Sequence, residues 1–254
     1  MTALITGASS GIGRDMARVL AKKGVSLILV ARRTEPMEAL KNELSVPVEV
    51  ISCDLSKKEN IYELYGKLRD RKIDILINNA GFGVFGRFCD TDLDRETDMI
   101  ATNVTAMHMM MKLFLRDMKE RNSGYILNVA SSAAFLPGPL FSSYYASKAY
   151  IHRLTQAVAY ELKREGSKVY IGSLCPGPIK TNFDEVANVK SSLPMLSSEF
   201  VAEYAIKKMF AKQKVIVPGF SMKAGRVLAK LAPENLQMFF AYNTQRKKFG
   251  TDEK

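Results

Sequence analysis

The 254-residue chain has no tryptophan, two histidines and three cysteines, and each shortage argues against a class of site. Cys53, Cys89 and Cys175 are odd in number and far apart, so neither a disulfide framework nor the paired spacing of a zinc site is indicated. His108 lies in a methionine-rich helical segment and His152 in another helical pattern, where structural roles are expected. Because no cysteine and histidine residues cluster, we expect no bound metal.

Long apolar runs are also missing. No run approaches the roughly 20 residues that a membrane-spanning helix needs. Met1 leads directly into a strand-like pattern, without the charged and apolar regions of a secretory signal, so we expect none. Together with the unpaired cysteines, this predicts a reducing, cytoplasmic setting.

Acidic residues are outnumbered, which leaves a net charge of +11. Residues 201–254 hold eleven Lys and Arg against four Asp and Glu, a balance of +7. Such a balance can attract a phosphate-bearing cofactor, a lipid surface or a nucleic acid, but solubility is the simpler interpretation for the whole chain. No recognised nucleic-acid-binding motif is present, so we expect no nucleic-acid partner.

Strand-length apolar runs alternate with helix-length amphipathic segments up to about residue 217. Several runs are almost continuous in Val, Ile and Leu, as expected for parallel strands covered on both faces. The alternation predicts an α/β fold, with a single doubly wound Rossmann-like parallel sheet and helices on both faces. Repeats and low-complexity linkers are missing, which predicts one domain over residues 1–254. The predicted strands are 3–6, 26–31, 48–52, 73–78, 124–130, 168–174 and 215–217, and the predicted helices 13–23, 36–44, 61–71, 97–118 and 147–165.

A glycine-rich turn joins the first strand to the first helix. The bare backbone of Gly7 and Gly11 lets a pyrophosphate approach closely, and the free N–H groups of the next helix would point at it. Gly13 would let that helix pack tightly. A tight turn without a ligand is the alternative, but the position between strand and helix favours dinucleotide binding.

The second strand ends in Ala31, Arg32 and Arg33, where an NAD-preferring site would place a carboxylate for the ribose hydroxyls. Guanidinium groups suit a 2′-phosphate, because they bind it bidentately and stay charged. The sequence therefore predicts NADP(H) rather than NAD(H), with two plain surface arginines as the alternative. Asp54, after the third strand, could accept a hydrogen bond from the adenine amino group.

Tyr144 and Lys148 stand four residues apart, which places both side chains on one face of a helix. An ammonium beside a tyrosine favours the phenolate, so the phenol becomes a usable proton donor or acceptor near neutral pH. Ser131 and Ser132 end the fifth strand, and Ser131 precedes Tyr144 by thirteen residues. Tyr145 is expected to pack or to line a pocket.

With the Asn-Asn-Ala-Gly tetrad that ends the fourth strand, these motifs resemble the classical short-chain dehydrogenase/reductase family over about residues 1–181. The resemblance implies that Tyr144 is the catalytic acid/base, Lys148 its pKa-lowering partner and ribose ligand, and Ser131 the hydroxyl that orients a carbonyl. Asn103 matches the asparagine that anchors a proton-relay water. Ser132 is one residue short of the family spacing. The implied cofactor-binding residues are Gly7, Ser9, Ser10, Gly11, Ile12, Gly13, Arg32, Arg33, Asp54, Leu55, Asn79, Ala80, Gly81, Asn103, Tyr144, Lys148, Pro176, Gly177, Ile179 and Thr181.

The implied activity is an NADP(H)-dependent oxidoreductase that interconverts a carbonyl and a secondary alcohol. Negative charge develops on the carbonyl oxygen during hydride transfer, where the hydroxyls of Ser131 and Tyr144 would stabilise it and Tyr144 would deliver the proton. A non-catalytic NADP(H)-sensing regulatory protein is the alternative. A sensor would not need the complete set of Asn103, Ser131, Tyr144 and Lys148.

The segments expected to contact substrate are apolar, which suits a bulky hydroxysteroid, 3-ketoacyl or retinoid-like compound. Filling of the core is the alternative for some of them. Residues 182–200 are expected to form a lid. The candidate lining residues are Phe82, Val84, Phe85, Phe88, Phe135, Leu136, Leu140 and Phe141, with Phe183, Leu193, Met195 and Leu196 from the lid.

Residues 221–248 are predicted to form a C-terminal helical extension. Residues 221–230 are basic and amphipathic, and Pro233 opens a second helix that carries Phe239 and Phe240. Packing as a lid or as a subunit contact, in a homodimer or homotetramer, is the favoured interpretation. Peripheral membrane contact is the less favoured one.

Overall fold

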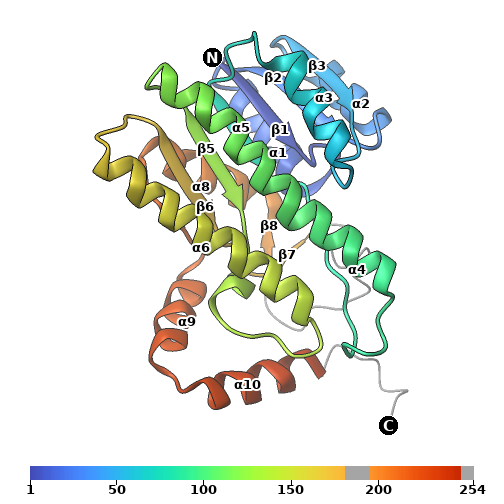
Figure 1. Cartoon of the computed structure of the whole chain (residues 1–254), viewed down its shortest axis with the longest axis vertical. Helices are drawn as coiled ribbons and strands as arrows, with labels where there is room; N and C mark the ends of the chain where they lie inside the picture. The colour runs from blue at the N-terminus through green and yellow to red at the C-terminus, as the bar shows by residue number, and fades with distance from the viewer. Residues whose placement is uncertain (181–194, 247–254) are drawn as a thin grey trace.

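A computed structural model describes residues 1–180 and 195–246. Seven parallel strands form one sheet in the order β3-β2-β1-β4-β5-β6-β9, with helices on both faces (Figure 1). The doubly wound α/β fold predicted from the sequence is confirmed. The sheet strands are β1 Thr2–Thr6, β2 Ser26–Ala31, β3 Val48–Ser52, β4 Ile75–Asn78, β5 Tyr125–Val129, β6 Tyr170–Leu174 and β9 Val215–Ile216, and a separate parallel pair is formed by β7 Ile179–Lys180 and β8 Leu196–Ser197.

The register of the sheet explains why the central strands are apolar throughout. Successive side chains of a strand point to opposite faces, so each row of paired residues belongs to one face. One row is Leu29, Ile5, Ile77 and Leu127, and the next is Ile28, Leu4, Leu76 and Ile126. The two rows belong to two different buried clusters, so neither face of the sheet is open to water.

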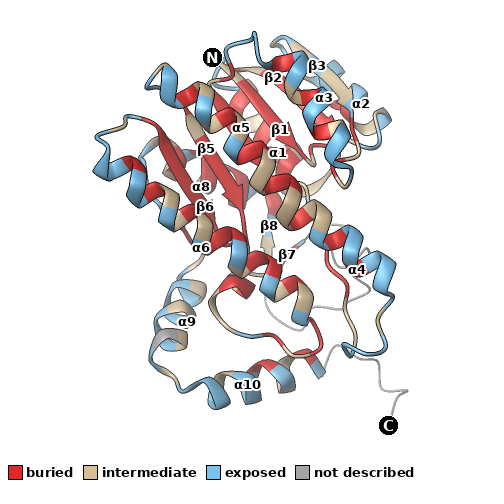
Figure 2. Ribbon diagram, viewed as in Figure 1, coloured by how far each residue is buried: buried red, intermediate tan, exposed pale blue. Residues whose placement is uncertain are grey.

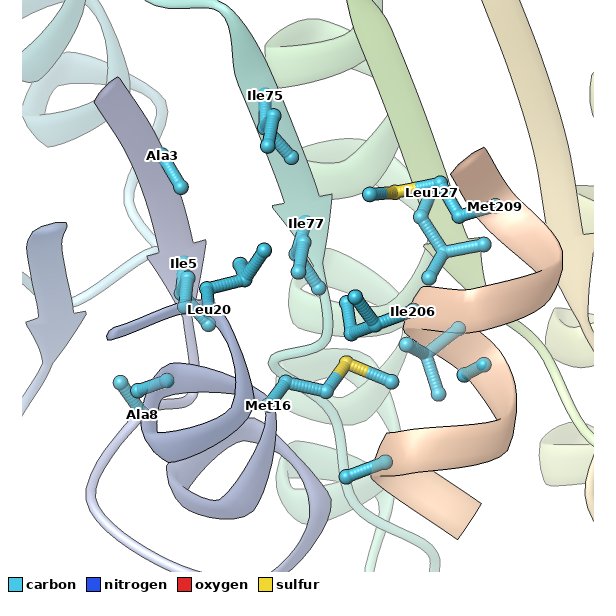
Figure 3. Packing of buried hydrophobic residues seen from close by; sticks show 14 of the residues in the cluster. Ala3, Ile5, Ala8, Met16, Leu20, Ile75, Ile77, Leu127, Ile206 and Met209 are labelled. Atoms are coloured by element: carbon cyan, nitrogen blue, oxygen red, sulfur yellow. The ribbon is translucent and has the colours of Figure 1, made fainter. Parts of the chain in front are cut away.

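Each buried cluster is closed by its own set of helices. Met16 and Leu20 of one helix and Ile206 of another meet Ile5 and Ile77 of the sheet (Figure 3). Figure 2 shows the same layering as buried strands beneath helices that are exposed on their outer sides. The first face carries α1 Gly11–Ala21, α2 Glu35–Glu43 and α8 Ser198–Phe210, and the second carries α3 Lys58–Leu68, α5 Met107–Glu120 and α6 Ser142–Arg164.

Two helices differ from their predicted form. The segment predicted as one helix over 97–118 consists of α4 Leu93–Ile100, a π-helical segment Ala101–Ala106, and α5. A π-helical segment widens the turn and re-aims its side chains, a feature that often accompanies functional sites. The helix predicted from residue 147 begins at Ser142, which places Tyr144 and Lys148 on one continuous helix.

The C-terminal extension forms two helices, α9 Phe220–Leu231 and α10 Glu234–Arg246, which lie at the lower end of the molecule in Figure 1. The aromatic face expected to be covered is open in the single chain, with Phe239 and Phe240 63% and 61% exposed. Among the residues described, none of the helices has the length and apolar character needed to cross a membrane.

Candidate active site

The carboxyl ends of the central strands open onto one cavity of about 720 Å³. In open α/β sheets the ligand crevice lies outside these strand ends, at the point where the strand order reverses. Here the reversal falls between β1 and β4. The volume lies within the range of about 300–1,000 Å³ that is typical of small-molecule sites.

The turn between β1 and α1 packs closely against the end of β4, and glycine makes this contact possible. Gly7 has φ +64°, and a Cβ on it would lie 2.8 Å from the Cα of Ala80. A Cβ on Gly13 would lie 2.4 Å from Nδ2 of Asn79 and 2.5 Å from the carbonyl oxygen of Gly7. Gly13 is therefore needed for contact between α1, the turn and the end of β4. No larger residue fits either position without moving backbone.

Asn79 braces this turn from the neighbouring strand. Its Nδ2 donates to the carbonyl oxygens of Thr6 and Gly7 at 3.0 and 3.1 Å. Thr6 Oγ1 accepts from the backbone N–H groups of Asn79 and Ala80 at 2.9 and 3.1 Å. The Asn-Asn-Ala-Gly tetrad thus fixes the shape of the glycine turn as well as lining the cavity beside it.

The first turn of α1 has backbone N–H groups that are available to bind an anion. The helix begins at Gly11, and within the described chain its N-cap Ser10 makes no side-chain capping bond. The first turn contains no acidic residue. Unsatisfied N–H groups and the positive end of the helix dipole therefore point where a pyrophosphate would sit. The turn fits a dinucleotide.

Arg32 and Arg33 follow β2 and line the far end of the same cavity. Both are exposed, and neither forms an ion pair with any described residue. Ala31 occupies the strand end where a carboxylate would select an unphosphorylated ribose. Asp54 and Leu55, at the end of β3, line the same region.

Lys148 lies between the end of β5 and the ring of Tyr144. Its Nζ donates to the carbonyl oxygen of Val129 at 3.1 Å and lies 5.7 Å from the centroid of the Tyr144 ring. Burial of the ammonium lowers the pKa of Lys148 from 10.5 to about 8. Tyr144 stacks on Phe141, with ring centroids 4.5 Å apart and an interplanar angle of 17°.

Ser131 reaches the cavity from the end of β5. It caps the 3₁₀ turn η2 Ser132–Phe135, because its Oγ accepts from the N–H of Ala133 at 3.1 Å. Ser131, Tyr144 and Lys148 all line the cavity that the glycine turn also lines. Ser132, the competing serine of the sequence, lines it too.

Asn103 lies behind the cavity wall in the π-helical segment and is fully buried. Its Oδ1 accepts from the N–H of Phe82 at 3.0 Å, and its Nδ2 donates to the carbonyl oxygen of Phe82 at 2.9 Å and to Ser147 Oγ at 3.1 Å. The side chain therefore ties the segment after β4 to α6. Its role in anchoring a relay water stays a prediction.

The structure gathers nearly all of the predicted site residues. Gly13 and Asn103 support the wall from behind, and Thr181 lies outside the described residues. The predicted residues that line the cavity directly are Gly7, Ser9, Ser10, Gly11, Ile12, Arg32, Arg33, Asp54, Leu55, Asn79, Ala80, Gly81, Ser131, Tyr144, Lys148, Pro176, Gly177 and Ile179.

Only some of the residues predicted to contact substrate line the cavity. Phe82 and Phe141 line the cavity, whereas Phe88 is 67% exposed and Leu196 packs against a core cluster. The rest of the set is not part of the described lining: Val84, Phe85, Phe135, Leu136, Leu140 and Met195. Phe183 and Leu193 lie outside the described residues. Sequence reasoning missed Gln245 of α10, which lines the cavity from the C-terminal extension.

A Lys148→Met variant is expected to be more stable than the wild type at about pH 7 when no nucleotide is bound. The unfolded chain keeps this proton up to about pH 10.5, whereas the folded chain loses it near pH 8. The cost of the buried charge is therefore full below pH 8, falls as the pH rises towards 10.5, and amounts to about 3 kcal/mol at most. Denaturant unfolding at a series of pH values measures the difference.

Lys163→Met, an exposed position on the same helix, is the matched control. Its stability is expected to follow the wild type at every pH. A Lys148→Met protein that gained no stability relative to this control at neutral pH would contradict the buried-charge interpretation.

The chain was compared with known proteins. It matches the family described as short chain dehydrogenase over residues 1–191. Hydroxysteroid dehydrogenase-like protein 1 from Gallus gallus is 34% identical over 227 residues, which are 86% of this chain and 67% of that protein. The chain thus spans about two thirds of that relative's length.

Two solved structures are similar over the whole chain and 96% of their own length. One is a short-chain dehydrogenase from Sphingobium yanoikuyae in complex with NADPH, with a TM-score of 0.82 and 28% identity. The other is a bulky-bulky ketone specific alcohol dehydrogenase from Comamonas testosteroni, with a TM-score of 0.78 and 27% identity. With the strand order, the braced glycine turn and the Ser, Tyr and Lys residues on one cavity, these matches show that the chain belongs to the short-chain dehydrogenase/reductase family of oxidoreductases.

Proposed function

We propose that the protein is an NADP(H)-dependent oxidoreductase that interconverts a carbonyl and a secondary alcohol on a bulky, apolar substrate. One observation carries the proposal: Ser131, Tyr144 and Lys148 line the same cavity as the glycine turn at Gly7 and Gly11. A nucleotide seated on that turn and a substrate beside Tyr144 would share one space. The bound nicotinamide supplies or takes up the hydride.

The roles of the three side chains follow from their surroundings. Tyr144 donates its proton to the carbonyl oxygen during reduction and takes it back during oxidation. Ser131 donates a second hydrogen bond to that oxygen as its negative charge develops. The Lys148 ammonium, which donates to the carbonyl oxygen of Val129, favours the phenolate of Tyr144 and would be available to bind the ribose of a nucleotide.

The preference for NADP(H) is supported by charge at the end of β2. Arg32 and Arg33 line the cavity, and the neighbouring strand end carries Ala31 in place of a carboxylate, so two cations would be available to a 2′-phosphate. The NADPH complex of the Sphingobium relative supports the same choice.

The lining of the cavity beside Tyr144 supports an apolar substrate. Phe82, Phe141 and Ala133 form an apolar wall beside Tyr144, in a cavity of about 720 Å³ that also has to hold the nucleotide. The names of the relatives, which refer to hydroxysteroids and to bulky-bulky ketones, support this class. A hydroxysteroid or a 3-ketoacyl derivative would suit it.

The direct test is the consumption of NADPH with a panel of hydrophobic ketones, from small cyclic ketones to steroid ketones. We expect turnover with the bulky members and a strong preference for NADPH over NADH. Tight NADPH binding without turnover of any ketone would support the alternative, a non-catalytic NADP(H)-sensing protein.

We further propose that residues 1–254 form one catalytic domain with two closing segments, 182–200 as a lid and 221–248 on the substrate side. Of the lid, residues 182–194 lie outside the described residues, and 196–200 belong to β8 and the start of α8. Two contacts support the second role: Met222 of α9 packs against Gly177, and Gln245 of α10 lines the cavity. The open face at Phe239 and Phe240 would be covered by a second subunit in a homodimer or homotetramer. The free cysteines support a cytoplasmic location.

Truncation after Phe220 is expected to raise KM for a bulky ketone about tenfold or more, while nucleotide affinity changes little. The deletion removes the Gln245 wall but leaves the glycine turn and the catalytic residues in place. Steady-state kinetics measure KM, and light scattering measures the oligomeric state. An unchanged KM and an unchanged number of subunits, together with lost binding to anionic liposomes, would favour the membrane-surface alternative.

A further inference from the structure

One polar pair in the cavity, the buried Gln245 and the partly buried Tyr145, has no part in the mechanism above. Gln245, in the last turn of α10, is 3% exposed, and its Nε2 donates to the hydroxyl oxygen of Tyr145 at 2.6 Å. Both residues line the cavity. The bond joins the C-terminal extension to the catalytic helix α6 across a separation of 100 residues (Figure 1).

The hydrogen-bonding capacity of this pair is only half used. Because the Gln245 amide donates to the Tyr145 oxygen, the phenolic proton of Tyr145 is left for another acceptor, and no described residue accepts it. The amide oxygen Oε1 of Gln245 is buried and has no partner in the described part of the chain. A buried polar atom without a partner is destabilising, because it has given up its hydrogen bond to water, and a ligand that donated a hydrogen bond to it would remove this cost.

The surroundings hold Tyr145 in place and keep it a donor. Its ring lies 6.0 Å from the Phe141 ring, and a Cβ on Gly138 would come within 2.3 Å of it. Burial raises the pKa of the Tyr145 phenol, so it stays protonated at neutral pH.

Tyr145 cannot duplicate the work of Tyr144. Adjacent helical residues point in directions about 100° apart, and the two rings are nearly perpendicular, at 74°, with centroids 6.2 Å apart. The unused donor and acceptor therefore lie apart from the point where the carbonyl reacts.

We propose that Tyr145 and Gln245 form a polar subsite that selects substrates with a hydroxyl group elsewhere than at the reacting carbon. The substrate hydroxyl accepts a hydrogen bond from Tyr145 and donates one to the amide oxygen of Gln245, which fills both unused positions. The inference deepens the proposed function and rests on it: the substrate is a bulky, apolar hydroxy-ketone or the corresponding diol. A hydroxyl suits the pair better than a second carbonyl, which can only accept.

The test compares two probes: a saturated steroid ketone with a hydroxyl on the ring farthest from the carbonyl, and the same ketone without that hydroxyl. In the wild type, kcat/KM is expected to favour the hydroxylated probe by about tenfold or more. Tyr145→Phe and Gln245→Met are each expected to abolish most of this preference, mainly by raising KM for the hydroxylated probe. The double variant should lose little more than either single one, because both act on one hydroxyl.

Tyr160→Phe, an exposed tyrosine on α6, is the matched control and should keep the wild-type preference. If Tyr145→Phe and Gln245→Met lowered kcat/KM equally for both probes, the two residues would have a merely structural role and the proposed subsite would be wrong. An unchanged preference in both variants would also overturn it. If the wild type turned over neither probe nor any other ketone, the proposed function itself would fail, which is a separate outcome.

Discussion

Replacement of Tyr144 by phenylalanine is expected to lower kcat by about 10²–10⁴-fold while NADPH affinity stays near the wild-type value. The lost hydroxyl acts on the reacting oxygen in the transition state, and general acid–base catalysis contributes an effect of this size. The ring should keep its stacking on Phe141, 4.5 Å away, so the cavity wall is preserved. Steady-state kinetics give kcat, and nucleotide titration gives the binding constant.

Two comparisons sharpen this test. Tyr160→Phe removes a hydroxyl from an exposed position of the same helix and should leave kcat unchanged. Ser131→Ala is expected to lower kcat more than Ser132→Ala, although both serines line the cavity. Near-normal turnover by the Tyr144→Phe protein would rule out the proposed proton donor.

The nucleotide half of the site could be predicted closely from the sequence, because local chemistry determines it. Gly7 has a positive φ and close neighbours that exclude a Cβ, so the required residue type shows directly in the sequence. The strands could be recognised in the sequence because their residues are apolar on both faces of the sheet. A parallel sheet then brings the carboxyl ends of these strands to one edge. The order of these segments along the chain then predicted that Asp54 and Asn79 line the same cavity as the glycine turn.

The substrate half could not be predicted in the same way, because tertiary packing decides which apolar side chain faces a cavity and which fills a core. Phe82 and Phe85 stand three residues apart, yet only Phe82 lines the cavity. Phe85 packs against Phe141 instead, with ring centroids 5.7 Å apart. Apolar character alone does not distinguish these two environments.

Two further features of the structure could not be predicted, because no local sequence pattern marks them. The π-helical segment at Ala101–Ala106 lies within an ordinary helical pattern, and the contacts of Asn103 with Phe82 and Ser147 depend on it. Gln245 reaches the cavity only because α9 and α10 fold back towards the start of α6. A single glutamine near the end of a helix gives no hint of a partner 100 residues away.

The proposed preference for NADP(H) predicts an effect about as large as that of the Tyr144 replacement. Replacing Arg32 and Arg33 together by glutamine is expected to weaken NADPH binding by about 10²-fold or more, and NADH binding by a much smaller factor. Only NADPH carries the 2′-phosphate, and each lost charge-assisted contact costs about 1.5–3 kcal/mol, the lower value being apt for exposed groups. Both arginines are exposed and line the cavity.

Titration of each nucleotide by fluorescence, at two salt concentrations, measures the effect, since screening should reduce the contribution of the arginines in the wild type. The matched control replaces Lys163 and Arg164 by glutamine, a pair of exposed adjacent cations at the end of α6. This control removes the same net charge at a distant site, so it should lower NADPH affinity only slightly. Equal weakening of NADPH and NADH in the Arg32 and Arg33 variant would show that the arginines do not bind the 2′-phosphate, and the choice of NADP(H) over NAD(H) would be wrong.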